Sequence, residues 1–415
     1  MIVKDSEKTS DISKGLVLLM ATVCGFTVAN VYLNQTLLVS MSATFHISAA
    51  SIGISAASIG IIATLAQIGY ALGNLLLVPL GDIFERKKLI LFLLFAICIV
   101  LALNALSINK TWMMVTSLAL GIVTVVPQII VPLAANIASD HNRGKVLGNV
   151  AIGLVCGILG ARLVSGFIDV HFGWRMVYWT SAVATLFMIF LVYVYFPRSK
   201  GGNATSYKHL LMSLGPLFIK ERALQKACVS QGMMFASFSA FWTTLVFLLH
   251  THPYSYGSDM VGVIGLVGIA GAFATPIIGR LIDIKGEKFA SLLCMSISLL
   301  AFIGLIRGGY WLPGLILGAL LITVGTQANQ VACQFTIFQL GEEKRSRLNG
   351  LYMVSTFLGG SLGSYLGLLA WTKWQWNGVC AIAILMIAIS CCSLIPMNIL
   401  RKMIGNLMNK KGSNM

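Results

Sequence analysis

Long apolar runs, separated by short polar segments, follow one another along the whole chain. Each run approaches the roughly 20 residues that an α-helix needs to cross the hydrocarbon core of a bilayer. The pattern predicts an all-α membrane protein with twelve transmembrane helices. The expected helices are residues 15–38, 57–80, 89–107, 113–138, 146–168, 175–196, 226–249, 258–280, 289–307, 312–338, 348–371 and 377–396.

The longest polar stretch lies between the sixth and seventh apolar runs and divides the chain. We expect an N-terminal six-helix half (1–196), a cytoplasmic linker (197–225), and a C-terminal six-helix half with a short cytoplasmic tail (226–415). An internal repeat supports two pseudo-symmetric halves, for which a substrate site near the midplane between them is typical. At an offset of 202 the matched pairs are Gln128 and Gln330, Arg143 and Arg345, Gly148 and Gly350, Gly157 and Gly359, and Trp174 and Trp376.

Composition and charge agree with a membrane protein. Hydrophobic residues make up 57% and charged residues 10% of the chain, whereas soluble domains have roughly 45–50% and 25%. The net charge of +16 does not indicate nucleic-acid binding, because Lys and Arg concentrate in alternate connections instead of on one folded face. Under the positive-inside rule this alternation places both termini in the cytoplasm of a multi-pass protein, for which we expect the bacterial cytoplasmic (inner) membrane.

Tryptophans gather near the ends of the helices that carry few basic residues, which fits the interfacial preference of indole. These are Trp112, Trp174, Trp179, Trp311, Trp371, Trp374 and Trp376.

The sequence offers no nucleophile–base pair, paired carboxylates or metal-ligand spacing within its apolar runs, and no Walker-type loop. We therefore expect no enzyme activity, cofactor, metal or nucleic-acid partner. We expect a monomer that handles a small-molecule substrate within the lipid bilayer, with protons as the candidate coupling ion. A receptor or scaffold is the alternative from another class.

Two loops at corresponding places of the repeat carry the most specific signal. They read LGDIFERKKLI after the second run and GRLIDIKGEK after the eighth. Both resemble the signature loop of the major facilitator superfamily, although Val78 and Glu85 stand where that pattern has glycines. The resemblance implies an inner gate latched by an Asp that pairs across to the other half; the alternative is that the charges only set topology. The matching gate residues are Asp82, Arg86, Lys87, Gly279, Asp283 and Gly286.

The fifth run, with its Gly-Trp-Arg turn at 173–175, resembles the drug and sugar efflux branch of the same superfamily, but lacks that branch's Gly-Pro pair. The resemblance implies a proton-coupled exporter; the alternative is a facilitator or importer of a small organic anion without proton coupling. Small residues recur every fourth position in the fifth and eleventh runs, which indicates either static close packing or surfaces that slide. They are Gly153, Gly157, Ala161 and Ser165, then Gly359, Gly363 and Gly367.

Polar and aromatic side chains inside the apolar runs are the candidates for substrate binding, and interhelical hydrogen bonding is the alternative for each. Core packing is the alternative for the tryptophan among them. The candidates are Asn30, Tyr32, Gln35, Gln67, Tyr70, Gln128, Arg162, Trp242, Gln327 and Gln330. We also expect Pro127 and Pro132 to bend the fourth helix beside Gln128.

Arg162 is the one charge well inside an apolar run, and such charges mark functional sites by default. Its long stem also allows it to snorkel to the interface. Asp169 follows seven residues later on the same helical face, so the two side chains are candidates for an ion pair. We take Asp82, Asp169 and Arg162 as the candidates for proton coupling.

Overall fold

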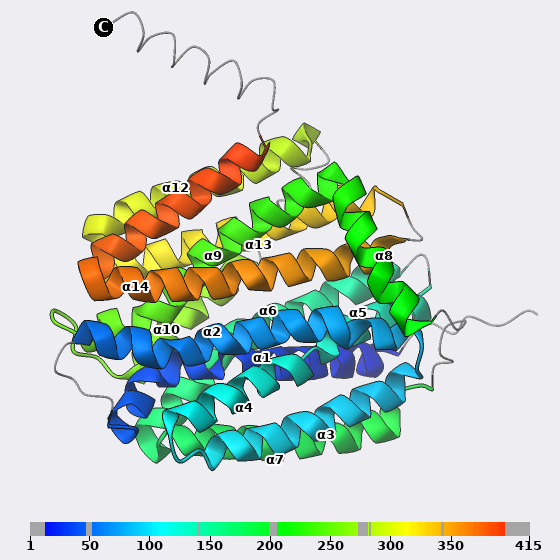
Figure 1. The fold of residues 1–415 in the computed structure, drawn as a ribbon, viewed down its shortest axis with the longest axis horizontal. Helices are drawn as coiled ribbons and strands as arrows, with labels where there is room; N and C mark the ends of the chain where they lie inside the picture. The colour runs from blue at the N-terminus through cyan, green and yellow to red at the C-terminus, as the bar shows by residue number, and fades with distance from the viewer. Residues whose placement is uncertain are drawn as a thin grey trace, which may run out of the picture.

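The computed structural model describes residues 13–46, 52–139, 142–198, 206–272, 281, 284–341 and 344–394, and these are almost entirely helical. The helices lie side by side along the long axis of the molecule (Figure 1). The first half of the chain forms α1 (Lys14–Thr44), α2 (Ile52–Leu76), the 3-10 helix η1 (Val78–Asp82), α3 (Arg86–Ala105), α4 (Lys110–Val123), α5 (Val126–Ile137), α6 (Arg143–Phe172) and α7 (Trp174–Tyr195). The second half forms α8 (Tyr207–Lys220), α9 (Arg222–His250), α10 (Ser258–Ala272), α12 (Glu287–Gly308), α13 (Leu312–Phe338) and α14 (Arg345–Leu394).

Eleven of the twelve expected crossings can be followed in this set, and the eighth is described in part. Ten described helices are long and apolar enough to cross a membrane, and an uninterrupted helix satisfies every backbone group within lipid. One of them, α14, is two helices that meet at Gln375, where the backbone leaves the helical region (φ 53°, ψ −146°). The described part of α10 takes the place of the expected eighth helix.

Two stretches differ from the expected helices. The fourth helix is broken into α4 and α5, because Thr124 and Val125 leave the helix and Pro127 opens the next one. Proline is well tolerated there, since the first backbone N–H groups of a helix have no intrahelical partner. The expected linker also contains a helix, α8, whose Tyr207 hydroxyl donates a 2.8 Å hydrogen bond to the Leu76 carbonyl. Figure 1 shows α8 crossing one end of the bundle.

The two ends of the bundle differ in charge. We call one the basic end: α1, α3, α6 and α9 begin there, and the Lys87 Nζ donates to the Phe196 carbonyl at the close of α7 (2.7 Å). At the opposite end, Lys110 at the start of α4 donates to Ser58 of α2 (2.7 Å). Arg175 of α7 donates there to the Ser107 carbonyl after α3 (2.9 Å). Each of these bonds joins two neighbouring helices of the first half.

Three tryptophans of the opposite end do not face a lipid interface as expected. Trp174, Trp371 and Trp376 are less than 5% exposed. The Trp174 indole donates to the Thr44 hydroxyl (2.9 Å), and the Trp376 indole donates to the Leu305 carbonyl (3.0 Å). A position near a helix end therefore does not distinguish an indole at the lipid interface from a buried indole that hydrogen-bonds to a neighbouring helix.

The small-residue ladders pack inside each half. The backbones of Gly153 and Gly157 on α6 lie directly against α1 at Gly25, and Gly359 on α14 lies in the same way against Gly232 of α9. A Cβ at Gly25, Gly153, Gly157 or Gly359 would overlap the facing backbone. The ladders therefore lie at contacts within each half and not at a surface between the halves.

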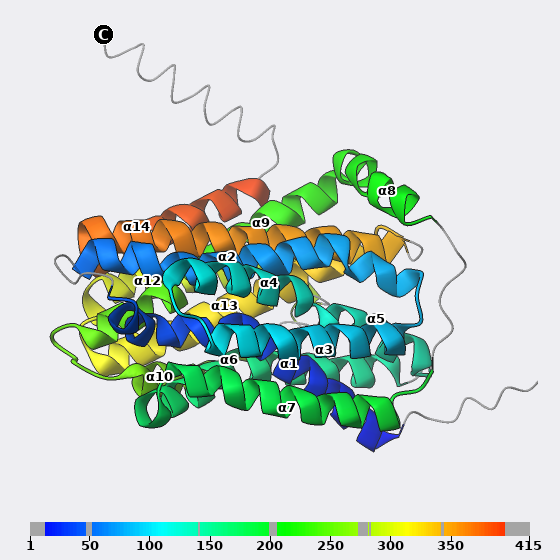
Figure 2. The ribbon, with the colours of Figure 1, turned by 60° about the horizontal axis from the view of Figure 1, so that its bottom comes forward.

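The halves meet along two pairs of helices. α2 lies beside α14 in both views (Figure 1, Figure 2), and Leu368 of α14 fills the space over Gly60 of α2. α6 packs against α10, where the backbone of Gly166 reaches that of Ser258. These contacts lie toward the opposite end of the bundle. The space between the halves that can hold a site therefore lies nearer the basic end.

Candidate functional site

A cavity of about 300 Å³ lies between the two halves. The first half supplies residues of α1, α2, α5 and α6, and the second half supplies residues of α9, α13 and α14. The cavity extends toward the basic end, where Gly148 of α6 and Gln334 of α13 line it. Its principal lining side chains are Tyr32, Tyr70, Gln128, Val155, Ile158, Phe235, Gln327, Gln330, Gln334, Met353, Thr356 and Phe357.

The polar part of this lining follows the internal repeat. Gln128 on α5 and Gln330 on α13 are matched positions, and both face the cavity. The break ahead of Pro127 places Gln128 in the first turn of α5, from where its Nε2 makes a long 3.5 Å contact to the Tyr70 hydroxyl. Amide side chains both donate and accept, so the pair presents matched hydrogen-bonding groups to a solute from the two halves.

The apolar part is an aromatic cluster that joins the halves. The ring of Tyr70 on α2 lies 4.2 Å from that of Phe357 on α14, and Phe235 on α9 lies 5.3 Å from Phe357, centroid to centroid. Aromatic pairs at such distances contribute about 0.5–1.5 kcal/mol beyond the area they bury. The cavity therefore suits a small solute with both polar and apolar faces.

Arg162 lies behind the cavity wall and is fully buried. Its Nη2 donates to Gln35 Oε1 on α1, and its Nη1 donates to the Ile158 carbonyl, each at 2.8 Å. The snorkelling alternative is therefore wrong for this structure, because the guanidinium points into the protein. Among the described residues, no carboxylate oxygen lies within 4.0 Å of the Arg162 guanidinium, the distance that defines an ion pair.

Aromatic rings from both halves enclose the Arg162 guanidinium. Its Cζ lies 4.3 Å from the ring centre of Trp242 and 5.9 Å from that of Phe238, both on α9, and 5.3 Å from that of Tyr32 on α1. A desolvated cation–π contact is worth about 2 kcal/mol or more. Trp242, a candidate for substrate binding, thus contacts a cation that belongs to the protein itself. Tyr32 separates it from the cavity.

Polar contacts between the halves close the space toward the opposite end. Gln67 of α2 donates to the Ser364 hydroxyl of α14 (2.9 Å) and accepts from the Ser239 hydroxyl of α9 (3.2 Å). The Thr243 and Ser364 hydroxyls lie 2.9 Å apart. Gln67 is fully buried in this contact, so it lies in the seal of the cavity and not in its lining.

Asp169 is buried beside the contact between α6 and α10. Its Oδ2 accepts from the Ser40 hydroxyl of α1 at 2.7 Å, whereas its Oδ1 has no hydrogen-bond partner. One turn earlier on α6, Gly166 meets the start of α10. The anticipated ion pair between Asp169 and Arg162 is not formed, because each side chain takes neutral partners.

The signature loop of the first half is held within that half. Arg86 pairs with Asp82 (3.4 Å) and donates to the Gly81 carbonyl (3.1 Å). The Asp82 carboxylate also lines a small pocket with Arg347 of α14, but Arg347 donates to Ser213 of α8 instead (3.3 Å). In the described residues Asp82 therefore has its ion pair inside its own half.

The second copy of this loop is described only in part, and Gly279 and Asp283 lie outside the described residues. Gly286 is the N-cap of α12, with φ +83°. Residues other than glycine rarely adopt this backbone conformation, so glycine is strongly favoured here. At the matching position Glu85 caps α3 with φ −59°, which explains why the first copy needs no glycine there.

Sequence reasoning located part of the cavity lining. Five of its candidates, Tyr32, Tyr70, Gln128, Gln327 and Gln330, line the cavity together. Gln35, Arg162 and Trp242 form the cluster behind Tyr32. Asn30 instead lines a separate groove between α1 and α6.

Sequence reasoning missed the aromatic side of the cavity. Phe235 and Phe357 line it, but a phenylalanine in an apolar run does not stand out. The spacing of Phe235, Phe238 and Trp242, three and then four residues apart, is a helical stripe that could have identified this face of α9.

A bundle of membrane-crossing helices in two repeated halves, with a mixed polar and aromatic cavity between them, defines a solute transporter of the alternating-access type. The sequence profile of the Major Facilitator Superfamily matches residues 16–340. This chain therefore belongs to the Major Facilitator Superfamily, whose members are transporters and not enzymes.

Similar proteins extend over most of the chain. The uncharacterized transporter YgaY of Escherichia coli is 35% identical over 370 residues, which cover 89% of this chain and 92% of that protein. A Helicobacter pylori protein named "Probable sugar efflux transporter" is 24% identical over 344 residues, 80% of this chain and 82% of its own. The crystal structure of the human organic anion transporter MFSD10 has the same fold, with a TM-score of 0.71 at 15% identity over 92% of this chain and 98% of that one.

Proposed function

We propose that this protein exports a small organic solute in exchange for protons. The observation that carries the proposal is the cavity shared by both halves, which extends toward the basic end and is sealed toward the opposite end. The positive-inside rule places the basic end in the cytoplasm, so in this conformation the site exchanges solute with the inside, as an exporter requires when it loads its substrate. The similarity to a protein named as a sugar efflux transporter supports the same direction.

Asp169 is our candidate for the proton site in preference to Asp82. The Asp82 side chain is 40% exposed and already paired with Arg86, whereas Asp169 is buried with one unpartnered oxygen. Buried carboxylates within membrane helices are the usual proton relays of transporters. Because Asp169 lies beside the α6–α10 contact, opening the outer end would expose it to the outer solution, where it can take up a proton.

The test uses purified protein in liposomes and a solute identified first. A panel of radiolabelled sugars and small carboxylates is screened for compounds that raise the melting temperature, and the compound that binds is used for transport. An imposed pH gradient should drive its accumulation by the unmodified protein. Asp169→Asn should lose this pH-driven accumulation by tenfold or more but keep solute counterflow, because counterflow needs only alternating access.

Asp259→Asn is the matched control, since Asp259 lies at the start of α10 beside the same contact but is partly exposed. It should leave both assays within about twofold of the unmodified protein. Equal pH-driven accumulation by Asp169→Asn and the unmodified protein would remove Asp169 from the mechanism. A pH gradient that drives no accumulation of a solute that exchanges readily would contradict proton coupling altogether.

A second candidate function, uncoupled transport of a small organic anion, is favoured by Arg162. Its guanidinium is permanently charged, has no carboxylate partner among the described residues, and leaves its Nε without a hydrogen bond. The ring of Tyr32 lines the cavity and lies 5.3 Å from the Arg162 Cζ. A carboxylate or phosphate on the solute would complete the fork of the guanidinium. Preference for carboxylates over sugars in the binding screen would favour this function.

A further inference from the structure

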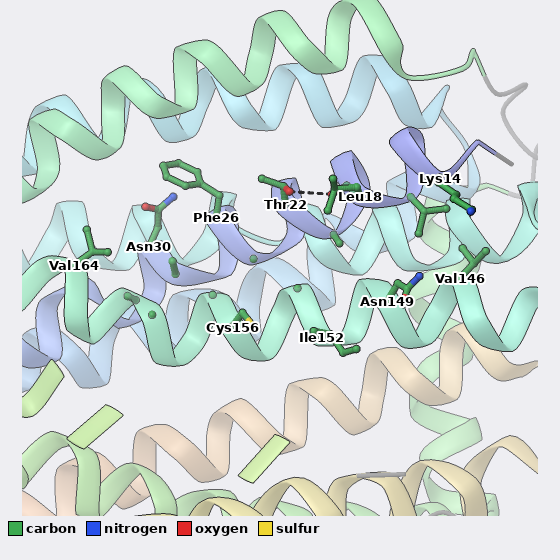
Figure 3. A pocket seen from close by; sticks show the side chains of 18 of the residues that line it. Lys14, Leu18, Thr22, Phe26, Asn30, Val146, Asn149, Ile152, Cys156 and Val164 are labelled. Carbon is green, nitrogen blue, oxygen red and sulfur yellow. Dashed lines mark hydrogen bonds between the residues drawn. The ribbon is translucent and has the colours of Figure 1, made fainter. Parts of the chain in front are cut away.

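A second, larger hollow lies beside the cavity between the halves. It is a groove of about 880 Å³ formed by α1 and α6, with Ser181 of α7 on its edge. Figure 3 shows side chains of α1, including Leu18 and Phe26, and of α6, including Ile152 and Val164, along its length. The groove runs from the basic end, at Lys14, to beyond the middle of both helices.

The wall of the groove is apolar and faces outward. Leu18, Ile152 and Val164 are each more than half exposed. Of the described membrane helices, α6 has the least buried apolar window, because it has the groove on one side and the central cavity on the other. Ile152 and Cys156 line both spaces. Exposed apolar side chains at membrane depth contact hydrocarbon, so acyl chains are the natural filling.

The end of the groove is cationic. Lys14 and Lys145 line it at the basic end together with the Asn149 amide, and none of the described residues that line it is acidic. Figure 3 shows Lys14 and Asn149 at this end of the groove. Anionic lipids give the cytoplasmic leaflet its negative surface potential, and basic pockets between helices on that side are suited to their headgroups.

The length also fits one leaflet. From Lys14 to Phe26, α1 rises about 18 Å at 1.5 Å per residue. Half of a bilayer, headgroups included, measures roughly 20–22 Å. A phospholipid with its phosphate at the lysines would therefore place its chains beside Leu18, Thr22 and Phe26.

We propose that this groove is a binding site for one anionic phospholipid of the cytoplasmic leaflet. Lys14, Lys145 and Asn149 bind the phosphate, and the apolar walls of α1 and α6 hold the acyl chains. A bound lipid differs from the surrounding bilayer in that it fills the hollow behind α6, the helix that also forms a wall of the transport cavity.

The test measures lipid bound to the purified full-length protein by native mass spectrometry. Phosphatidylglycerol and phosphatidylcholine with identical acyl chains are added in a titration. We expect the unmodified protein to retain one phosphatidylglycerol at least tenfold more tightly than phosphatidylcholine. Lys14→Gln combined with Lys145→Gln should remove this preference, because each basic residue near the headgroups contributes to binding.

Two further variants separate a built site from general surface charge. Lys208→Gln combined with Lys220→Gln removes the same charge from exposed positions on α8 and should leave the preference intact. Leu18→Trp narrows the apolar part of the groove without changing charge and should weaken retention of the lipid, with an unchanged melting temperature in lipid-free detergent.

Three results would overturn the proposal. One is equal retention of the two lipids by the unmodified protein, and another is an equal loss of preference in the α8 control. The third is the finding that a second copy of the chain, and not lipid, occupies the groove and is released by Leu18→Trp.

Discussion

Arg162 places a charged side chain inside a membrane helix, which costs free energy. Placing an arginine at the centre of a membrane helix costs about 2.5–3.5 kcal/mol on insertion scales. Among the described residues no carboxylate offsets the charge, which is instead stabilised by two hydrogen bonds and by rings from α1 and α9. A single desolvated cation–π contact of about 2 kcal/mol recovers much of that cost. The guanidinium is thus stable in place but still able to accept an anion.

We predict that Arg162→Gln lowers transport by at least tenfold and that Arg162→Lys lowers it less. Glutamine loses the charge and the fork, whereas lysine keeps the charge. Counterflow in liposomes measures the effect, and melting temperature in detergent checks the fold. Arg307→Gln, at an exposed position of α12, is the matched control and should transport normally. Normal transport by Arg162→Gln would show that the residue serves packing alone.

For single residues, the sequence identified which side chains carry functional chemistry better than it identified their contact partners. Arg162 was recognisable as a functional candidate because it is a lone charge within an apolar run. The partner inferred for it, Asp169, shares its helical face, but helical spacing cannot show what neighbouring helices bring. Ser40 on α1 reaches Asp169, and Gln35 on the same helix reaches Arg162. Both partners depend on how α1 packs on α6.

Among the elements, α1 and α6 form the tightest described pair of the first half, and glycine permits it. Gly157 faces the Gly25 backbone with no room for a Cβ, whereas Gly160, less than one turn later, has nothing within 4 Å of a built Cβ. The same helix therefore has one face that tolerates only glycine and another that is open.

This contrast gives a prediction about stability. Gly157→Leu should destabilise the protein by about 1–3 kcal/mol or more, because the added atoms overpack a closed contact. Gly160→Leu should leave the melting temperature nearly unchanged and serves as the control for helix propensity. Thermal unfolding in detergent, with size-exclusion profiles, measures both. Equal losses in the two variants would mean that the close approach of α6 to α1 is not what stabilises this half.

Helix positions were predictable where they depended on hydropathy, and less so where they depended on turns. The apolar runs predicted α3, α7 and α12 within a few residues. They missed α8, because this helix lies in a polar segment and packs only one side on the bundle. They also missed the extension of α1 to Thr44, since the residues after 38 are helical but less apolar.

For the whole molecule, the internal repeat was the most informative sequence signal. It predicted a substrate site between two pseudo-symmetric halves, and the matched residues Gln128 and Gln330 both line the cavity there. It could not predict which end is sealed, because both alternating conformations share one sequence. The closed contact formed by Gln67, Ser364 and Ser239 is a property of this conformation, and the sequence repeat does not specify it.

If the sealed end must open during transport, a covalent bridge across it should stop the cycle. Gly60 on α2 and Leu368 on α14 suit such a bridge, because the Leu368 Cγ lies 3.0 Å from a Cβ built on Gly60. Replacing both with cysteine removes the leucine branches and leaves room for a disulfide. In a background without the exposed Cys156 and Cys392, we predict that oxidation abolishes transport and that a reductant restores it.

The control is a bridge that spans two helices of the same half. The Thr36 and Ser165 hydroxyls lie 2.6 Å apart between α1 and α6, so Thr36→Cys with Ser165→Cys should also form a disulfide on oxidation. Because α1 and α6 move together if each half is a rigid unit, this bridge should leave at least half of the transport rate. Loss of transport in both variants would indicate that motion within the halves, and not between them, carries the solute. Transport that survives a complete Gly60–Leu368 bridge would show that the sealed end stays closed throughout the cycle.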